Sequence, residues 1–155
     1  MIPSCSISTD IIVGFPGETQ TEFDHLMNFV EQIGFDRLGV FTYSDEEDGA
    51  AYKLSGKVPG DIKETRAQTL MSLQSEIAKA KNSQLIGTIQ QVIIDEYDEH
   101  NNQYIGRTEF DAPEIDGQVF ISNIIAQPGD ILNVRITHAY DYDLVAEGIS
   151  DESAK

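Results

Sequence analysis

The spacing of hydrophobic positions along the chain changes character near residue 84. Before that point, short apolar runs alternate with longer stretches in which apolar residues recur every three or four positions. After it, only short strand-like segments separated by turn residues are found. This change predicts strand–helix units followed by a small all-β domain. We therefore expect two structural units, residues 1–83 and 84–149, and a polar, disordered tail at 150–155.

Two apolar runs in the first unit predict strands, at 6–13 and 37–43. The unbroken run Ile11-Ile12-Val13 favours a strand buried on both faces, as in a parallel sheet. The second run is expected to bury Leu38, Val40 and Phe41. A helix between two such strands gives the length that a right-handed parallel crossover needs.

Helix signals follow each strand. Thr19 and Glu22 fit a capping box, and apolar residues then recur at helical spacing up to Gly34. Asp61 is the expected N-cap of a second helix that reaches about residue 82, with Lys63 and Arg66 among its polar positions. The loop between the second strand and this helix, 44–60, is too long and irregular for a bare turn, so we expect it to have a functional or docking role. Its acidic run could bind a hard cation, but a solvated charge run is the stronger interpretation, because the chain has no Asp-x-Asp-x-Asp-Gly loop.

The second unit reads as five short strands, which predict a small antiparallel barrel. Their expected ranges are 86–96, 104–108, 117–121, 131–138 and 141–148.

The segment 106–117 is more acidic than a plain turn requires. It holds four carboxylates within eight positions and closes on Asp116-Gly117, a pair suited to a turn with φ > 0. We expect it to present Asp111, Glu114 and Asp116 to a partner.

Charge narrows the class of partner. The chain carries a formal charge of −17, and residues 84–149 contain twelve Asp or Glu but only two Arg, a charge of −10. Such a domain would repel a phosphate backbone, so direct nucleic-acid binding is disfavoured and a basic protein is the better partner. The alternative is that the acidic surface only maintains solubility.

Other features exclude whole classes of protein. No apolar run is long enough to cross a membrane and no signal peptide is found, so we expect a cytoplasmic protein without a membrane partner. The single cysteine, Cys5, can complete neither a disulfide nor an iron–sulfur site. The three histidines have no ligand-like spacing, so we assign no catalytic and no metal-binding residue in this chain.

The run from Asp10 to Thr19, the acidic segment and the Gln127-Pro128-Gly129-Asp130 turn together resemble the radical S-adenosylmethionine methylthiotransferases. The closest branch modifies an aspartate of a small-subunit ribosomal protein. The resemblance implies the last two βα units of an incomplete TIM-like radical SAM barrel, followed by a five-stranded, OB-like TRAM domain. It also implies transfer of a methylthio group to the aspartate β-carbon, with S-adenosylmethionine and two 4Fe–4S clusters as cofactors.

From the residues alone, the turn after the first strand could either line a ligand or be purely structural. The family pattern there is Gly-x-Ile-x-Gly-x-x-Glu, which Ile12 and Gly14 match, whereas Asp10 replaces the first glycine and the acid comes one position late at Glu18. The resemblance therefore implies that Ile12 packs on the adenine. The cofactor-site wall that it implies comprises Ile12, Gly14, Phe15, Pro16 and Gly17. Glu18 is expected to stabilise only the helix N-terminus.

The CxxxCxxC loop that holds the radical-generating cluster is not found in this sequence. We therefore expect a carboxyl-terminal part of a longer enzyme, inactive on its own, whose TRAM domain docks the basic ribosomal protein. Two alternatives stay open: the branch that methylthiolates adenosine in transfer RNA, whose TRAM domains are more basic, and a non-catalytic acidic protein-binding module.

Overall fold

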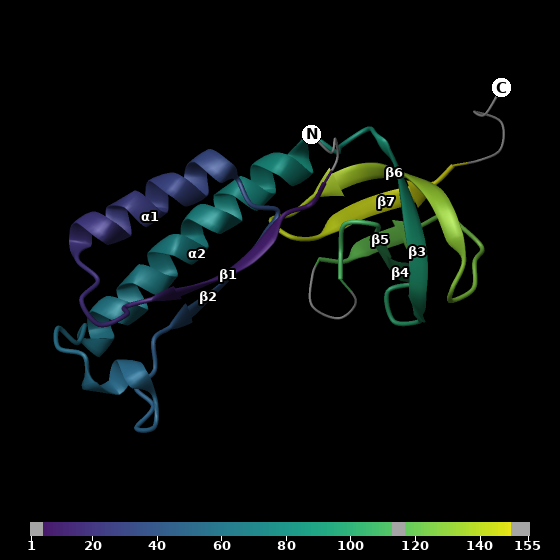
Figure 1. Cartoon of the computed structure of the whole chain (residues 1–155). Coiled ribbons are helices and arrows are strands. Elements are labelled where there is room, and N and C mark those ends of the chain that lie inside the picture. The colour runs from purple at the N-terminus through teal and green to yellow at the C-terminus, as the bar shows by residue number, and fades with distance from the viewer. Residues whose placement is uncertain (1–4, 113–116, 150–155) are drawn as a thin grey trace. The chain divides into compact units, whose positions relative to one another are not determined.

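The computed structural model describes residues 5–112 and 117–149, and its elements are labelled in Figure 1. The chain divides into two compact units, residues 1–77 and 78–155, so the boundary lies within a long helix.

The first unit is built on two parallel strands, β1 (Ser8–Val13) and β2 (Arg37–Thr42). Their register runs from Ser8 opposite Arg37 to Val13 opposite Thr42. Helices α1 (Gln20–Ile33) and α2 (Gly60–Ser83) lie on the same side of these strands (Figure 1). The core between the helices and the strands is formed by Val13, Phe23, Val30, Phe35, Leu38 and Leu70.

The other face of these two strands is open. Ile12 and Phe41 are register partners on that face and are 58% and 57% exposed. The expectations that the first strand is buried on both faces and that Phe41 is buried in the second are therefore wrong for the described residues. The reason is that alternate side chains of a strand point to opposite faces, and α1 and α2 cover only one of them.

Both helix starts follow local rules. The capping box of α1 is confirmed: Thr19 and Glu22 exchange hydrogen bonds, and the helix ends at Gly34 with φ 62°. Asp61 is not the N-cap of α2, because the helix already begins at Gly60 and the Pro59 carbonyl accepts from the Lys63 amide. In the first turn, the Asp61 carboxylate still interacts favourably with the helix dipole. A short 3-10 helix, η1 (Ala50–Lys53), lies in the preceding loop.

The second unit is a closed barrel, as predicted. It comprises β3 (Ile89–Asp98), β4 (Gln103–Thr108), β5 (Val119–Ser122), β6 (Ile131–Ala139) and β7 (Leu144–Gly148), in the order β3-β4-β5-β7-β6. It is not wholly antiparallel, because β5 pairs with β7 in parallel. Strand direction cannot alternate all the way around a ring with an odd number of strands, so at least one pair must be parallel.

The barrel interior is filled by alternate residues of its strands. The buried members are Val92, Ile94, Val119, Ile121, Val134, Ile136, Leu144 and Ala146. Register shifts lie between Ile94 and Glu96 and between Ile136 and His138, at points where a small barrel must bend sharply. The Gln127–Asp130 turn is confirmed, with Gly129 at φ 94° and the Asp130 amide donating to the Gln127 carbonyl.

Candidate functional site

The turn that follows β1 has two glycines in left-handed conformations. Gly14 has φ 77° and Gly17 has φ 93°, values that other residues adopt only with strain. The Gly17 amide donates to the Gly56 carbonyl at 2.8 Å, so the long loop after β2 supports the turn from outside. A Cβ atom added to Gly17 would meet nothing within 4 Å, which leaves this part of the turn accessible.

The five residues predicted to line a cofactor fall into two groups. Ile12, Phe15 and Gly17 are exposed at the carboxyl end of β1, whereas Gly14 and Pro16 are buried. The exposed residues could contact a ligand. The buried ones shape the turn that carries them.

An aromatic pair extends this surface to the end of β2. The rings of Phe15 and Tyr43 meet edge to face with centroids 5.2 Å apart. Lys57 lies over the Tyr43 ring at 5.7 Å and forms an ion pair with Asp45. Partial desolvation, together with a hydrogen bond to Asp45, raises the pKa of Tyr43. The bond from Lys57 lowers the pKa of Asp45, so this member of the acidic run is engaged within the fold.

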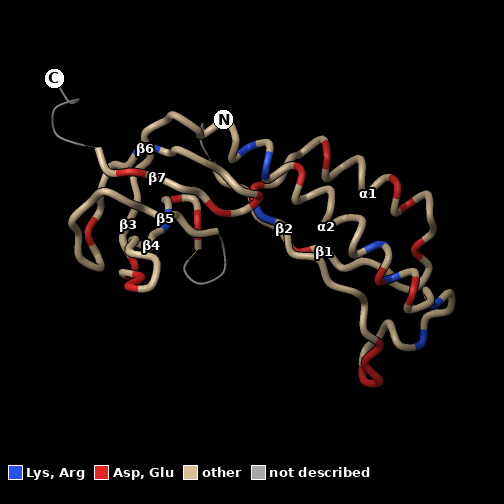
Figure 2. The backbone as a smooth tube through the Cα atoms, turned by 180° about the vertical axis from the view of Figure 1, so that it is seen from behind, with Lys and Arg blue, Asp and Glu red and all other residues tan. Residues whose placement is uncertain are grey.

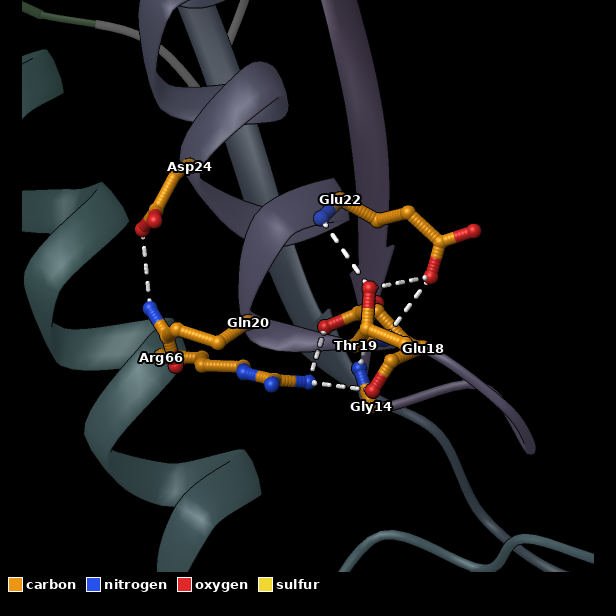
Figure 3. Close-up of polar contacts among 7 residues, drawn as sticks. All are labelled: Gly14, Glu18, Thr19, Gln20, Glu22, Asp24 and Arg66. Carbon is orange, nitrogen blue, oxygen red and sulfur yellow. Dashed lines mark hydrogen bonds and ion pairs between the residues drawn. The ribbon is translucent and has the colours of Figure 1, made fainter.

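A buried ion pair joins the turn to α2 (Figure 3). Arg66 Nη1 lies 2.5 Å from Glu18 Oε1, and Glu18 Oε2 accepts from the Gly14 amide at 2.9 Å. The Arg66 side chain is only 7% exposed, although its sequence position indicated a polar helix face. Sequence reasoning missed this contact because 48 residues separate the two partners and nothing in the local spacing signals it.

The acidic segment begins at the end of β4. Asp111 Oδ2 accepts from the Thr108 hydroxyl at 2.6 Å, so this carboxylate also orders the start of the segment. Glu114 and Asp116 lie outside the described residues. The turn expected of Asp116 and Gly117 therefore falls partly outside the described residues, although Gly117 itself is described. A glycine is required there because any Cβ would overlap the Tyr142 backbone.

Charge is distributed unevenly between the elements. Lys and Arg gather on and beside α2, whereas the barrel strands and turns carry mainly Asp and Glu (Figure 2). Among the described residues, no group of three or more His, Cys, Asp or Glu could hold a metal ion. In the same part of the chain, no helix has both the length and the apolar character needed to cross a membrane.

Two comparisons with known proteins show what the chain is similar to. The family model of the TRAM domain matches residues 86–149, which hold the closed barrel. The chain is 46% identical over 147 residues to the ribosomal protein uS12 methylthiotransferase RimO of Natranaerobius thermophilus, a match covering 94% of this chain and 33% of the relative. The protein of the same name from Sorangium cellulosum is 45% identical over 154 residues, covering 99% of this chain and 32% of the relative. The chain is therefore related to the ribosomal protein uS12 methylthiotransferases.

The match covers nearly all of this chain but only part of each relative. The chain spans about a third of the length of the uS12 methylthiotransferases that it matches. The same holds for the Christiangramia forsetii protein, which is 40% identical over 156 residues and is covered to 34%. The matched third includes the turn after β1, the ion pair and the whole barrel, so the candidate site lies within the shared region.

Proposed function

We propose that this chain is part of a uS12 methylthiotransferase, which adds a methylthio group to the β-carbon of an aspartate of that ribosomal protein in the cytoplasm. The observation that carries the proposal is the 46% identity to a relative of that name over 94% of the chain. Within it, we assign residues 1–83 to the end of a radical SAM barrel with its closing helix. Residues 84–149 are the TRAM domain.

The turn after β1 is the proposed wall of the S-adenosylmethionine site. The exposed side chains of Ile12 and Phe15 offer apolar surface for an adenine ring, and the open space at Gly17 permits close approach of a ligand. The carboxyl ends of parallel strands are where α/β folds bind ligands. When bound, S-adenosylmethionine supplies the hydrogen-abstraction chemistry, while Ile12, Phe15 and Gly17 bind and orient its adenosyl part.

The residues of this chain do not fit the iron–sulfur clusters. An iron–sulfur cluster needs several thiolate ligands, and the only cysteine here is the exposed Cys5. No step through a cluster is assigned to these residues.

The TRAM domain is the proposed docking surface for the basic ribosomal protein. We assign the docking to Asp111, Glu114 and Asp116, which belong to a segment, 84–149, whose formal charge is −10. Opposite charge on the two partners accelerates their encounter and fixes their orientation more than it adds affinity. Binding is therefore expected to weaken as salt is raised.

A hybrid enzyme tests the cofactor wall. This chain replaces the matching third of the Natranaerobius thermophilus relative, and methylthio addition to uS12 is followed by mass spectrometry. Ile12→Ala is expected to raise the KM for S-adenosylmethionine about tenfold, as for the loss of roughly 1.4 kcal/mol of apolar contact. Ile33→Ala, which truncates an exposed isoleucine of α1, is the matched control. Equal KM values for the two variants would refute the assignment of Ile12.

The same hybrid tests the docking surface. The triple variant Asp111→Asn, Glu114→Gln and Asp116→Asn should raise the KM for uS12 and leave the KM for S-adenosylmethionine unchanged. The control neutralises Glu46, Glu47 and Asp48, three exposed acids of the loop after β2, and so changes net charge equally. If both triple variants raise the KM for uS12 alike, only overall charge matters and the assigned surface is wrong.

The charge of the barrel also favours a second candidate function. A domain with twelve acids and two arginines can bind a basic protein without any chemistry. Binding of uS12 by the unmodified chain, together with a folded hybrid that transfers no methylthio group, would favour this non-catalytic module over the enzyme.

A further inference from the structure

The ion pair between Glu18 and Arg66 is more buried than a pair that only stabilises the fold is expected to be. The side chains of Glu18 and Arg66 are 14% and 7% exposed. Removing two charges from water costs free energy that their attraction repays only when every donor finds an acceptor. In the part of the chain that the structure describes, Arg66 Nε is buried and has no hydrogen-bond partner. Such a pair is poorly suited to stabilising the fold, so its geometry indicates another role.

Glu18 connects the pair to the backbone of the turn. One carboxylate oxygen contacts Arg66 Nη1, and the other accepts from the amide of Gly14, which is held at φ 77°. Arg66 Nη1 also donates to the Glu18 carbonyl at 3.2 Å. These three bonds fix the carboxylate on the Gly14 amide, and Figure 3 shows them converging from α2 and the turn.

A second residue of the same helix face reinforces the contact. Lys63 lies one turn before Arg66, and its aliphatic chain covers Gly14 so closely that a Cβ atom there would overlap it. Its Nζ donates to the Tyr43 carbonyl at 2.8 Å, directly after β2. Helix α2 thus holds the carboxyl ends of both parallel strands, where the rings of Phe15 and Tyr43 meet.

We infer that Glu18 and Arg66, supported by Lys63, are positioning residues that hold the turn of residues 14–17 in the shape that binds the adenosyl group. This inference rests on the proposed function. Neither member of the pair needs to touch the ligand: Arg66 acts through Glu18, and Glu18 acts through the Gly14 amide. A preorganised turn needs no further ordering when a ligand binds. Loss of the ion pair is therefore expected to weaken the affinity for S-adenosylmethionine.

The first test uses this chain without any ligand. Amide hydrogen exchange of Gly14 is measured by NMR in the unmodified chain and in the double variant Glu18→Met/Arg66→Met, which leaves no unpaired buried charge. Exchange at Gly14 should accelerate about tenfold, the equivalent of roughly 1.4 kcal/mol for one lost hydrogen bond. The control, Lys79→Met/Asp141→Asn, removes an exposed ion pair of the barrel unit and should leave Gly14 unchanged. Equal exchange at Gly14 in the unmodified chain and the double variant would overturn the inference.

The second test uses the hybrid enzyme. The double variant should raise the KM for S-adenosylmethionine about tenfold, with kcat at saturation and the KM for uS12 unchanged. An unchanged KM for S-adenosylmethionine would overturn the inference. A double variant that loses both its kcat and its bound iron would also overturn it, because that result would show a role in folding. A folded, iron-loaded hybrid with no activity would instead contradict the proposed function, and the exchange measurement would still decide whether the turn is held as described.

Discussion

Gly117 shows at the residue scale how one missing side chain permits the barrel to close. A Cβ at this position would overlap the Tyr142 carbonyl, and the next residue, Gln118, donates its amide to Asp143 Oδ1 at 2.9 Å. The chain before β5 therefore lies directly against the chain before β7. This contact brings the parallel pair together.

The substitution Gly117→Ala is accordingly expected to destabilise the barrel by roughly 3 kcal/mol, because backbone atoms cannot move aside as a flexible side chain can. Gly60→Ala is the matched control, since Gly60 lies in α2 with nothing near its Cβ position. That change should stabilise its helix by about 0.5–1 kcal/mol. Urea unfolding followed through amide signals of β5 and of α2 measures both effects. A similar change in both variants would contradict the steric explanation.

Residue-level features could be predicted from sequence where the partner is close along the chain. The capping box of Thr19 and Glu22 and the left-handed Gly34 are of this kind. The burial of Arg66 and the role of Gly117 are not, because their partners lie far away in sequence and become neighbours only through the tertiary fold.

At the scale of elements, β6 tests whether the barrel register is as described. Ile136 is fully buried in the core, whereas Ile131, in the same strand, is 60% exposed. We expect Ile136→Ala to cost about 3–4 kcal/mol, through lost burial and a residual cavity, and Ile131→Ala to cost less than about 0.5 kcal/mol. Urea midpoints of the two variants check this difference. Since a one-residue slip moves every side chain to the other face, comparable costs would show that the register is wrong.

The start of α1 should depend on pH. Hydrogen bonds from the Thr19 amide and hydroxyl hold the pKa of Glu22 below its ordinary value of 4.5. The ionised form is therefore favoured by the folded state, so its stabilising effect is present above that ordinary value and is lost as pH falls through the lower, folded value. An NMR titration of the Glu22 carboxyl and the Thr19 amide should show both changing together. In Glu22→Gln the Thr19 amide should no longer titrate there, and an unaltered titration would contradict the capping role.

The elements themselves could be predicted better than their pairing. All five barrel strands were expected near their observed ranges, because β-branched runs and turn residues are local signals. The parallel pairing of β5 with β7 follows from closing an odd number of strands, a constraint that no single segment carries. The number of layers on each face of a strand is likewise not a local signal: an apolar run such as the one that holds Ile12 shows that a strand can be buried, but not how many layers cover it.

At the scale of the whole molecule, the two units have separate cores. Among the described residues, the fully buried members of the barrel core lie between Val92 and Ala146, and those of the first core lie between Val13 and Leu70. The end of α2 belongs to the second unit. There Asn82 is 7% exposed, and its side-chain amide donates to the carbonyls of Tyr140 and Asp141 at 3.3 and 3.1 Å.

This arrangement predicts where the barrel can be cut. A fragment of residues 78–149 should fold cooperatively, because it keeps the closed sheet, its core and the Asn82 contacts. A fragment of residues 84–149 should be less stable by about 1–3 kcal/mol, because the two carbonyls lose their donor and Ala78 is removed. At this size that difference is a large share of the total stability.

Urea unfolding of the two fragments measures the difference, and Asn82→Ala in the longer fragment is the control. If the hydrogen bonds are responsible, this variant should account for most of the loss, since it removes the donor and keeps the rest of the helix end. Equal stability of all three proteins would show that the last turns of α2 contribute nothing to the barrel. The domain would then begin at residue 84, the boundary that the change in hydrophobic spacing predicts.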